Sequence, residues 1–180
     1  MPDTAFANSP HDTKNIIDLS TGAPLVVKLL ESSQGKGVIL AETKKAASSV
    51  ISAFQKLNAP FIIQDFIKDA NGSDLRLFVI GGKVIASMMR SSSDDDFRSN
   101  LHAGGKANTV KITQEERRIA KQAVKAMGLN IAGVDILRSN EGPKVLEVNS
   151  SPGLQGIESI NDIKFASLII DYVEKRLGLS

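Results

Sequence analysis

Asp135, Glu147 and Asn149 are the residues whose types and spacing best fit a chemical role. They lie on two apolar stretches, 131–137 and 144–149, which read as consecutive β-strands joined by a turn-rich loop. Side chains alternate along a strand, so Glu147 and Asn149 project on the same side. Mg²⁺ takes oxygen ligands, usually one or two carboxylates, and completes its octahedron with water and phosphate. The three side chains therefore predict a metal platform for a nucleotide.

The expected register of this hairpin brings the two carboxylates together. A hairpin symmetric about Glu141 places Asp135 opposite Glu147 and Leu137 opposite Val145. Like charges at facing positions destabilise a sheet, and a dication would offset their repulsion. The alternative is that one acid points into solvent, because a one-residue slip would reverse the faces. The opposite face is expected to be apolar, formed by Val134, Ile136, Leu146 and Val148.

Lys28 is the only charged residue in the apolar stretch 24–30, and Gly35-Lys36-Gly37 follows it. A lysine beside a glycine loop can hold nucleotide phosphates, and the bare backbone N–H groups of the loop can close over the same oxygens. Two structural alternatives stay open. Lys28 could extend into solvent from a sheet edge, and Gly35 and Gly37 could form an ordinary hairpin tip.

Arg90, Arg98 and Asn100 flank an acidic loop. Guanidinium groups bind phosphate and carboxylate through a planar fork of donors, and positive charge near a transferring phosphoryl group stabilises the transition state. These residues are therefore candidate catalytic groups, although scattered arginines often belong to a solvated face. The loop acids 94–96 read as a solvated turn, and no role is assigned to His102.

Composition restricts the possible functions. The chain has 180 residues, of which 42% are apolar, so it can form one domain or two small lobes. The 22 Lys and Arg nearly balance 20 Asp and Glu without a long basic run, so we expect no direct nucleic-acid binding. There is no cysteine for a disulfide or a thiol nucleophile. No apolar run reaches the length of a membrane span, so we expect a cytoplasmic protein.

The elements that must position these residues follow from local patterns. Residues 9–19 read as a short helix, and Gly81-Gly82 predicts a tight hairpin turn. Thr43 is expected to cap a helix, and Thr113-Gln114-Glu115-Glu116 is a capping box. Most neighbouring strands are joined by tight turns, which predicts an α+β fold with antiparallel sheets. The expected strands are 24–30, 38–41, 61–64, 75–80, 83–89, 131–137 and 144–149, and a final helix is expected at 163–177.

Several motifs together resemble RimK-type ATP-grasp ligases. They are Ala23-Pro24-Leu25-Val26-Val27-Lys28-Leu29, Gln34-Gly35-Lys36-Gly37-Val38, Asp96-Phe97-Arg98-Ser99-Asn100-Leu101-His102, Ala132-Gly133-Val134-Asp135-Ile136-Leu137 and Glu147-Val148-Asn149-Ser150-Ser151-Pro152-Gly153-Leu154. The resemblance implies the ATP-grasp fold, with two α+β lobes, antiparallel sheets and ATP between them. We expect a linker and short helix at 1–23, a small lobe at 24–89 and a large lobe with the metal site at 90–180.

The resemblance also implies roles for individual residues. Lys28 would contact ATP phosphates, with Gly35 and Gly37 in the loop above them. Asp65 and Phe66 would form the hinge beside adenine, where the family usually has Glu-Tyr. Asp74 would hold the ribose, and Arg98, Ser99 and Asn100 would line the phosphate and acyl-phosphate region. Arg90 or Arg98 would offset the charge that develops in the transition state. Two Mg²⁺ (or Mn²⁺) ions would be held by Asp135, Glu147 and Asn149, with Glu147 bridging them.

RimK-type enzymes add glutamate to the carboxyl end of a small-subunit ribosomal protein. The resemblance therefore implies ATP, glutamate and a protein acceptor as partners, an acyl-phosphate intermediate, and possible assembly into tetramers. Family members begin with an extra α/β domain, so the resemblance implies that these 180 residues correspond to the ATP-binding and catalytic lobes alone. Three alternatives remain: a related ligase acting on a carrier protein or small-molecule carboxylate, a non-catalytic ATP-binding module, and a non-nucleotide metal-binding protein.

Overall fold

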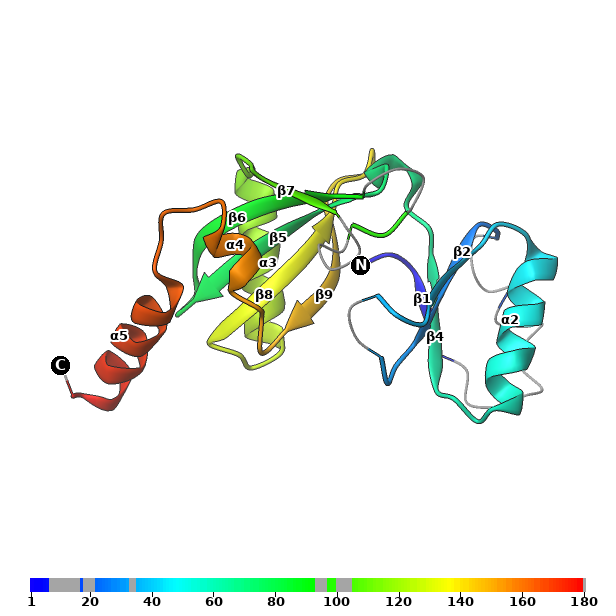
Figure 1. Cartoon of the computed structure of the whole chain (residues 1–180), viewed down its shortest axis with the longest axis horizontal. Helices are drawn as coiled ribbons and strands as arrows, with labels where there is room; N and C mark the ends of the chain where they lie inside the picture. The colour runs from blue at the N-terminus through cyan, green and yellow to red at the C-terminus, as the bar shows by residue number, and fades with distance from the viewer. Residues whose placement is uncertain (7–16, 18–21, 33–34, 93–96, 100–104, 180) are drawn as a thin grey trace. The chain divides into compact units, whose positions relative to one another are not determined.

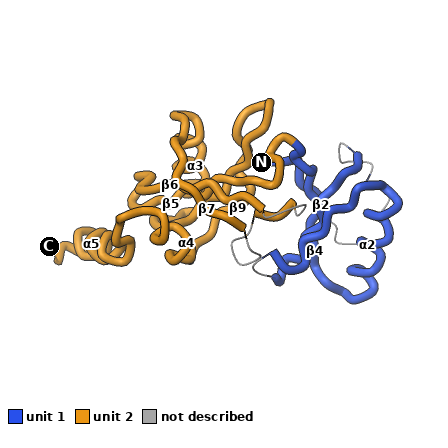
Figure 2. The backbone as a smooth tube through the Cα atoms, turned by 45° about the horizontal axis from the view of Figure 1, so that its top comes forward, with its two compact units in different colours: residues 1–68 blue, residues 69–180 orange. Residues whose placement is uncertain are grey.

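A computed structural model of the chain describes residues 1–6, 17, 22–32, 35–92, 97–99 and 105–179. The chain divides into two compact units, Met1–Lys68 (unit 1) and Asp69–Ser180 (unit 2), which Figure 2 draws in blue and orange. Each unit has its own antiparallel sheet and helices. No helix in the described part of the chain is both long and apolar enough to span a membrane.

Unit 1 is a four-stranded sheet with one long helix. The strand order is β1-β4-β2-β3, and every neighbouring pair is antiparallel. Alternate residues of β2 and β4 point to the helix α2, whose buried Ala47 and Ile51 complete the core. The elements are β1 (Thr4–Phe6), β2 (Leu25–Leu29), β3 (Val38–Ala41), α2 (Lys44–Lys56) and β4 (Phe61–Asp65).

Local chemistry explains most of unit 1. The Thr43 hydroxyl accepts a hydrogen bond from the backbone N–H of Ala46, so α2 begins where the sequence predicts. The strand β1 was not predicted, because a linker and a short helix were expected before residue 24. This strand has only three residues, too few to show a hydrophobic period. The helix expected at 9–19 falls outside the described residues except for Ile17, which is buried in the core.

Unit 2 is a five-stranded sheet in the order β7-β6-β5-β8-β9, reached from unit 1 through the short helix η2 (Lys68–Ala70). Gly81 and Gly82 both have positive φ and join β5 to β6 in the expected tight turn. The elements are β5 (Ser73–Ile80), β6 (Lys83–Ser91), β7 (Lys106–Thr109), α3 (Gln114–Ala126), β8 (Ile131–Leu137), β9 (Lys144–Asn149), α4 (Gln155–Glu158) and α5 (Phe165–Leu177).

The two faces of this sheet differ. The first face, with Leu75, Leu77 and Val134, packs against α3, which lies behind the sheet in Figure 1. The second face is apolar at one end, where Phe78 and Phe165 stack edge to face with ring centroids 4.8 Å apart. That end is covered by α4 and the beginning of α5. The other end of the second face carries charged residues and forms the candidate site.

The structure differs from the expected lobe boundary and hairpin register. The hairpin β5–β6 belongs to unit 2, because β5 pairs with β8, whereas the sequence places the boundary at 89/90. Within the hairpin β8–β9, Asp135 faces Glu147 as expected, but Ile136 faces Val145 and Leu137 faces Lys144. The symmetric register is therefore wrong beyond Asp135, because Leu146 is the extra residue of a β-bulge.

Candidate functional site

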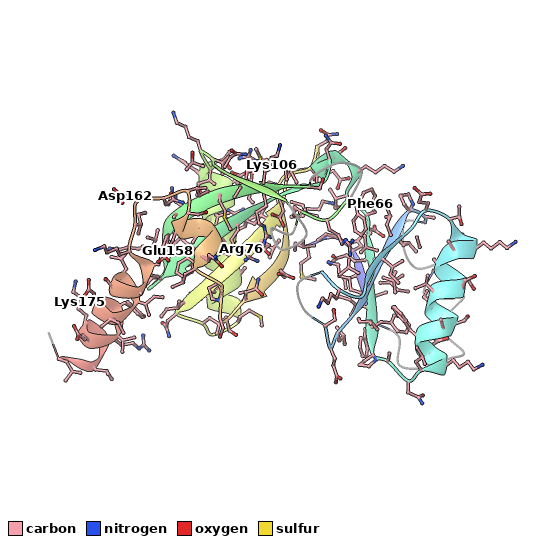
Figure 3. All side chains as sticks on the ribbon, viewed as in Figure 1. Phe66, Arg76, Lys106, Glu158, Asp162 and Lys175 are labelled. Atoms are coloured by element: carbon pink, nitrogen blue, oxygen red, sulfur yellow. The ribbon has the colours of Figure 1, made fainter. Side chains whose placement is uncertain are left out.

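Four charged residues gather where β6, β5 and β8 run side by side. Cross-strand pairing places Asp74 opposite Arg90 and Arg76 opposite Asp135. Asp74, Arg90 and Asp135 are 4%, 6% and 1% exposed, and Arg76 is half-buried. Figure 3 shows Arg76 on the sheet of unit 2. Strand alternation thus delivers two acids and two arginines to one end of one face.

Hydrogen bonds connect these four side chains. Arg76 donates from Nε and Nη2 to Asp135 Oδ1 and Oδ2, both at 2.7 Å. Arg90 donates from Nε to Asp74 Oδ1 at 2.7 Å, and its Nη2 donates to both Asp74 Oδ2 and Asp135 Oδ2. Arg90 therefore bridges the two acids. Each arginine donates two hydrogen bonds, from Nε and Nη2, to the two oxygens of one carboxylate. Such two-bond pairing is stronger than a single hydrogen bond.

The environment separates the two buried acids. Burial by itself would raise the pKa of Asp135, but the hydrogen bond from Arg76 and the charges of Arg90 and Arg76 together hold it below its ordinary value. Asp74 has Arg90 and Ser99 as hydrogen-bonding partners, and burial raises its pKa. Asp135 is thus the better stabilised anion of the pair.

Glu147 and Asn149 lie beside this cluster on β9. Glu147 Oε1 accepts from Asn149 Nδ2 at 2.9 Å and lies 3.9 Å from Arg76 Nη2. The structure therefore brings Asp135, Glu147 and Asn149 together, as the sequence predicts. The pKa of Glu147 is raised, first by partial burial and then by the negative charge of Asp135. A cation at this point would reverse that shift.

The donor set fits a magnesium ion. Among the described residues no group of three His, Cys, Asp or Glu side chains is arranged to hold a metal. The site instead offers two carboxylates and an amide, and Mg²⁺ commonly uses one or two protein carboxylates. Asp135 Oδ1 accepts from Arg76 Nε, and a carboxylate oxygen can accept more than one bond, so it can also bind a cation. Burial and then the negative charge of Asp135 raise the Glu147 pKa, and a nearby cation would offset both effects.

Three predicted residues follow the loop after β6. Ser99 is buried and hydrogen-bonds to Asp74. Arg98 is half-buried, with its guanidinium carbon 5.9 Å from the centroid of the Phe97 ring. Asn100 lies outside the described residues. The structure thus connects Ser99 to the acid cluster.

Unit 1 positions Lys28 through a chain of hydrogen bonds. Lys28 Nζ donates to Gln64 Oε1 at 2.6 Å, Gln64 Nε2 donates to Thr4 Oγ1 at 2.9 Å, and Thr4 Oγ1 donates to the carbonyl of Pro2 at 2.9 Å. Gln64 is only 4% exposed. The strand β2 lies between β4 and β3, so the alternative that Lys28 extends from a sheet edge is wrong.

The other predicted residues of unit 1 lie at the ends of its strands. Gly35 and Gly37 have positive φ, which glycine adopts without strain. The Gly37 carbonyl accepts from the N–H of Leu29, which closes the loop at 3.0 Å. Asp65 ends β4, with its N–H donating to the Asp3 carbonyl at 2.9 Å, and Phe66 follows it (Figure 3).

Sequence reasoning missed Arg76 and Gln64. Both could have been found from alternation, because each is a polar residue on the side of its strand away from the helix. Asp74 and Arg76 share a side of β5, opposite Leu75 and Leu77. What the sequence could not supply is the pairing partner, Asp135, which lies 59 residues away along the chain.

Comparisons with known proteins identify the family of the chain. The RimK-like ATP-grasp domain matches residues 1–173. The probable alpha-L-glutamate ligase of Aliivibrio fischeri is 58% identical over 97% of this chain and 58% of its own length. That of Shewanella halifaxensis is 57% identical over 99% of this chain and 39% of its own length. The chain therefore spans about half the length of the curated relatives it matches.

Solved structures share the fold at low identity. D-cycloserine synthetase DcsG superposes with a TM-score of 0.76 at 16% identity, covering 98% of this chain and 65% of that one. ATP-grasp ligase PsnB, in complex with a precursor variant, Mg and ADP, gives 0.73 at 20% identity, covering 98% and 54%. The fold is thus the two-sheet α+β architecture that the sequence predicts.

Proposed function

The chain belongs to the RimK-like ATP-grasp family, and from this premise we propose that it takes part in ATP-dependent ligation of a carboxylate to an amine. The observation that carries the proposal is the cross-strand pair Asp135–Glu147 with Asn149 beside it. Relatives 57% and 58% identical are named probable alpha-L-glutamate ligases, which favours glutamate as the amine. The acceptor proposed is the terminal carboxylate of a small-subunit ribosomal protein.

The proposed reaction has two steps. A terminal carboxylate oxygen attacks the γ-phosphorus of ATP, so ADP leaves and an acyl phosphate forms. The glutamate nitrogen then attacks the acyl carbon, loses a proton, and phosphate leaves as the amide bond forms. Such transfers depend on positioning and on electrostatic stabilisation. When bound, Mg²⁺ neutralises phosphate charge.

The chain's own residues provide the positioning in this proposal. Asp135, Glu147 and Asn149 hold the metal, and Arg76 and Arg90 fix Asp135 through three hydrogen bonds. Because Arg90 is buried between two acids, we assign it a positioning role in place of direct contact with phosphate. Lys28, which belongs to unit 1, would contact the ATP phosphates.

The nucleotide contacts remain proposals carried over from the family. Asp65 and Phe66 would contact adenine, Asp74 the ribose, and Arg98, Ser99 and Asn100 the acyl phosphate. Both Asp74 oxygens already accept from Arg90, so a ribose contact would share them. Assembly into tetramers and use of Mn²⁺ in place of Mg²⁺ likewise belong to the proposal.

Mass spectrometry tests this function directly. Acceptor peptides with free carboxyl ends are incubated with the protein, ATP, Mg²⁺ and glutamate, and we expect successive increments of one glutamyl residue with matching release of phosphate. Amidated peptides, which lack the carboxylate, are the control. Carrier proteins and small-molecule carboxylates are tested as acceptors in the same way. If the protein binds ATP but changes the mass of none of these acceptors, a non-catalytic nucleotide-binding module is favoured.

A further inference from the structure

A basic groove lies on unit 2, formed mainly by the outer surface of α3 with the β5–β6 turn, the loop before β8 and the end of α5. We call it the α3 groove. Its volume is about 770 Å³. Among the described residues its lining contains no Asp or Glu, and it contains five cations: Arg117, Arg118, Lys121, Lys125 and Arg176. The whole chain has a net charge of only +2, so this concentration is local.

Most of this charge is not neutralised within the chain. Lys121 and Lys125 are exposed and form no ion pair with any described residue. Arg118 has Glu115 at 3.5 Å, both side chains being more than half exposed, which makes a weak pair. Arg117 donates to the backbone carbonyl of Val84. The groove therefore presents an unbalanced positive surface.

One cation is held in place by neutral partners. Arg176 Nη1 donates to Asn130 Oδ1 at 3.2 Å and lies 3.3 Å from the Tyr172 hydroxyl, which itself donates to Asn130 Oδ1 at 3.0 Å. Tyr172 is in turn fixed against the β5–β6 turn, because a Cβ on Gly81 would lie 2.5 Å from its ring. Arg176 is thus oriented without losing its charge.

The α3 groove is separate from the candidate metal site. The helix α3 covers the sheet face that carries Leu75, Leu77 and Val134. Asp135 alternates with Val134 along β8 and therefore points to the opposite face. The groove lies away from the face that carries the candidate metal site, so an anion bound in it would be remote from the proposed chemistry.

We propose that the α3 groove binds an acidic peptide segment, and that in the ligase this segment is a glutamate-rich tail. The second clause rests on the proposed function, which produces such tails. The lining offers three side-chain amides, Gln114, Gln122 and Asn130. The oxygens of Gln122 and Asn130 already accept bonds within the chain, but their NH₂ groups can donate to peptide carbonyls or carboxylates. It contains no aromatic ring among the described residues, so it lacks the stacking surface that single-stranded nucleic acids use.

The spacing of the cations sets the length of peptide required. The stretch of α3 from Arg117 to Lys125 spans about 12 Å at 1.5 Å per residue. An extended peptide covers that distance with about four residues. Affinity should therefore rise with the number of glutamates and level off near this length.

Fluorescence anisotropy with labelled oligoglutamates tests the site, using the full chain without ATP or metal. We expect hexaglutamate to bind, diglutamate to bind much more weakly, and hexaglutamine not to bind. Binding should weaken strongly at roughly 1 M salt, where the Debye length is about 3 Å. The double variant Lys121→Gln/Lys125→Gln should reduce hexaglutamate affinity about tenfold, because two ion pairs are lost.

The matched control is Lys45→Gln/Lys56→Gln on α2, two exposed lysines of unit 1, which should leave hexaglutamate affinity unchanged. Equal affinity in the Lys121→Gln/Lys125→Gln variant would overturn the proposal. So would an oligouridylate that binds as tightly as hexaglutamate, since it would mark a nucleic-acid site. The result is independent of catalysis: binding without ligation counts only against the proposed function, and ligation without binding counts only against the groove.

Discussion

At the scale of single residues, the number of arginine contacts distinguishes the pKa values of the acids in the site. Arg90 donates to both Asp74 and Asp135, but Asp135 also receives the fork of Arg76. Burial raises the pKa of Asp74 despite its bonds from Arg90, whereas the two arginines together hold the pKa of Asp135 below its ordinary value against the same burial effect. Glu147, with Asn149 as its partner and Asp135 opposite, is the acid whose charge is least compensated.

Replacing Glu147 by Gln should abolish metal-dependent ligation with little effect on folding. The change removes the negative charge at the proposed bridging ligand, and we expect ligation to fall by about 100-fold or more. The side chain is 53% exposed, so the free energy of unfolding should change little. Turnover and Mg²⁺-dependent nucleotide affinity are the measurements, with Glu141→Gln on the exposed loop as control. Normal turnover would refute the assignment.

Replacing Arg90 by Lys should destabilise unit 2. A single ammonium cannot reproduce a fork to Asp74 and a bond to Asp135, so a buried acid is left poorly compensated. We expect a loss of about 3 kcal/mol in the free energy of unfolding, measured with urea. Arg118→Lys, on the exposed surface of α3, should change it by less than about 0.5 kcal/mol. Equal effects of the two substitutions would contradict a buried structural role for Arg90.

At the scale of elements, the hairpin β8–β9 sets the geometry of the site. The bulge at Leu146 shifts the alternation of β9 by one residue, so that Val145 packs with Val148 on the α3 side while Glu147 faces Asp135. The loop after β9 then returns over β8. Pro152 contacts the strand where Gly133 leaves room for it.

Replacing Gly133 by Ala should displace this returning loop. The new Cβ would lie 2.8 Å from the Pro152 Cβ, so Pro152 has to move, at a cost of about 1–3 kcal/mol. Urea unfolding and Mg²⁺-dependent nucleotide binding should both weaken, because Asn149 precedes this loop. Gly153→Ala is the control, since no atom lies within 4 Å of its Cβ position. If Gly133→Ala had the same free energy of unfolding and nucleotide affinity as Gly153→Ala, the close approach of Pro152 to Gly133 would not matter for stability or binding.

Elements with a local signal were predictable from sequence, and those fixed by distant pairing were not. Thr43 and Thr113 are N-caps, and they correctly predicted where α2 and α3 begin. The pair Gly81-Gly82 correctly predicted the turn between β5 and β6. The bulge at Leu146 was missed because β9 keeps an apolar alternation in either register. The strands β1 and β7 are short edge strands whose residues carry little periodicity.

The capping box of α3 makes unfolding depend on pH. Glu116 accepts from the Thr113 N–H at 2.7 Å and from Arg138 Nε at 2.6 Å, and despite burial these partners hold its pKa below the ordinary value. A lowered folded-state pKa gives stability that is present above the unfolded value and is lost as pH falls through the folded one.

Glu116→Gln should therefore lower the free energy of unfolding by about 1–2 kcal/mol at neutral pH. The difference from the original chain should shrink as pH falls through the folded-state pKa of Glu116, which lies below its ordinary value, because the folded chain then protonates this group as well. Urea unfolding across this range measures the effect. Glu115→Gln, which is exposed, serves as the control. A difference that persisted in acid would show that charge is not the cause.

At the scale of the whole molecule, the chain is two units with separate duties. Unit 1 contains Lys28 and the loop with Gly35 and Gly37, and unit 2 contains the acids and arginines of the candidate metal site. The sequence identified residues in both, because their types are unusual in apolar strands. The sequence prediction placed the boundary after β6, because the β5–β6 hairpin follows directly on the strands of unit 1 along the chain. The structure assigns β5 and β6 to unit 2, because β5 pairs with the distant strand β8.

The first strand of the chain has a practical consequence for biochemistry. Thr4 secures Gln64, and Gln64 secures the ammonium of Lys28. A purification tag or trimming that disturbs the opening segment would therefore loosen a side chain assigned to phosphate recognition without altering any ligand. Recombinant versions that differ only at their extreme amino end should not be assumed equivalent in nucleotide assays.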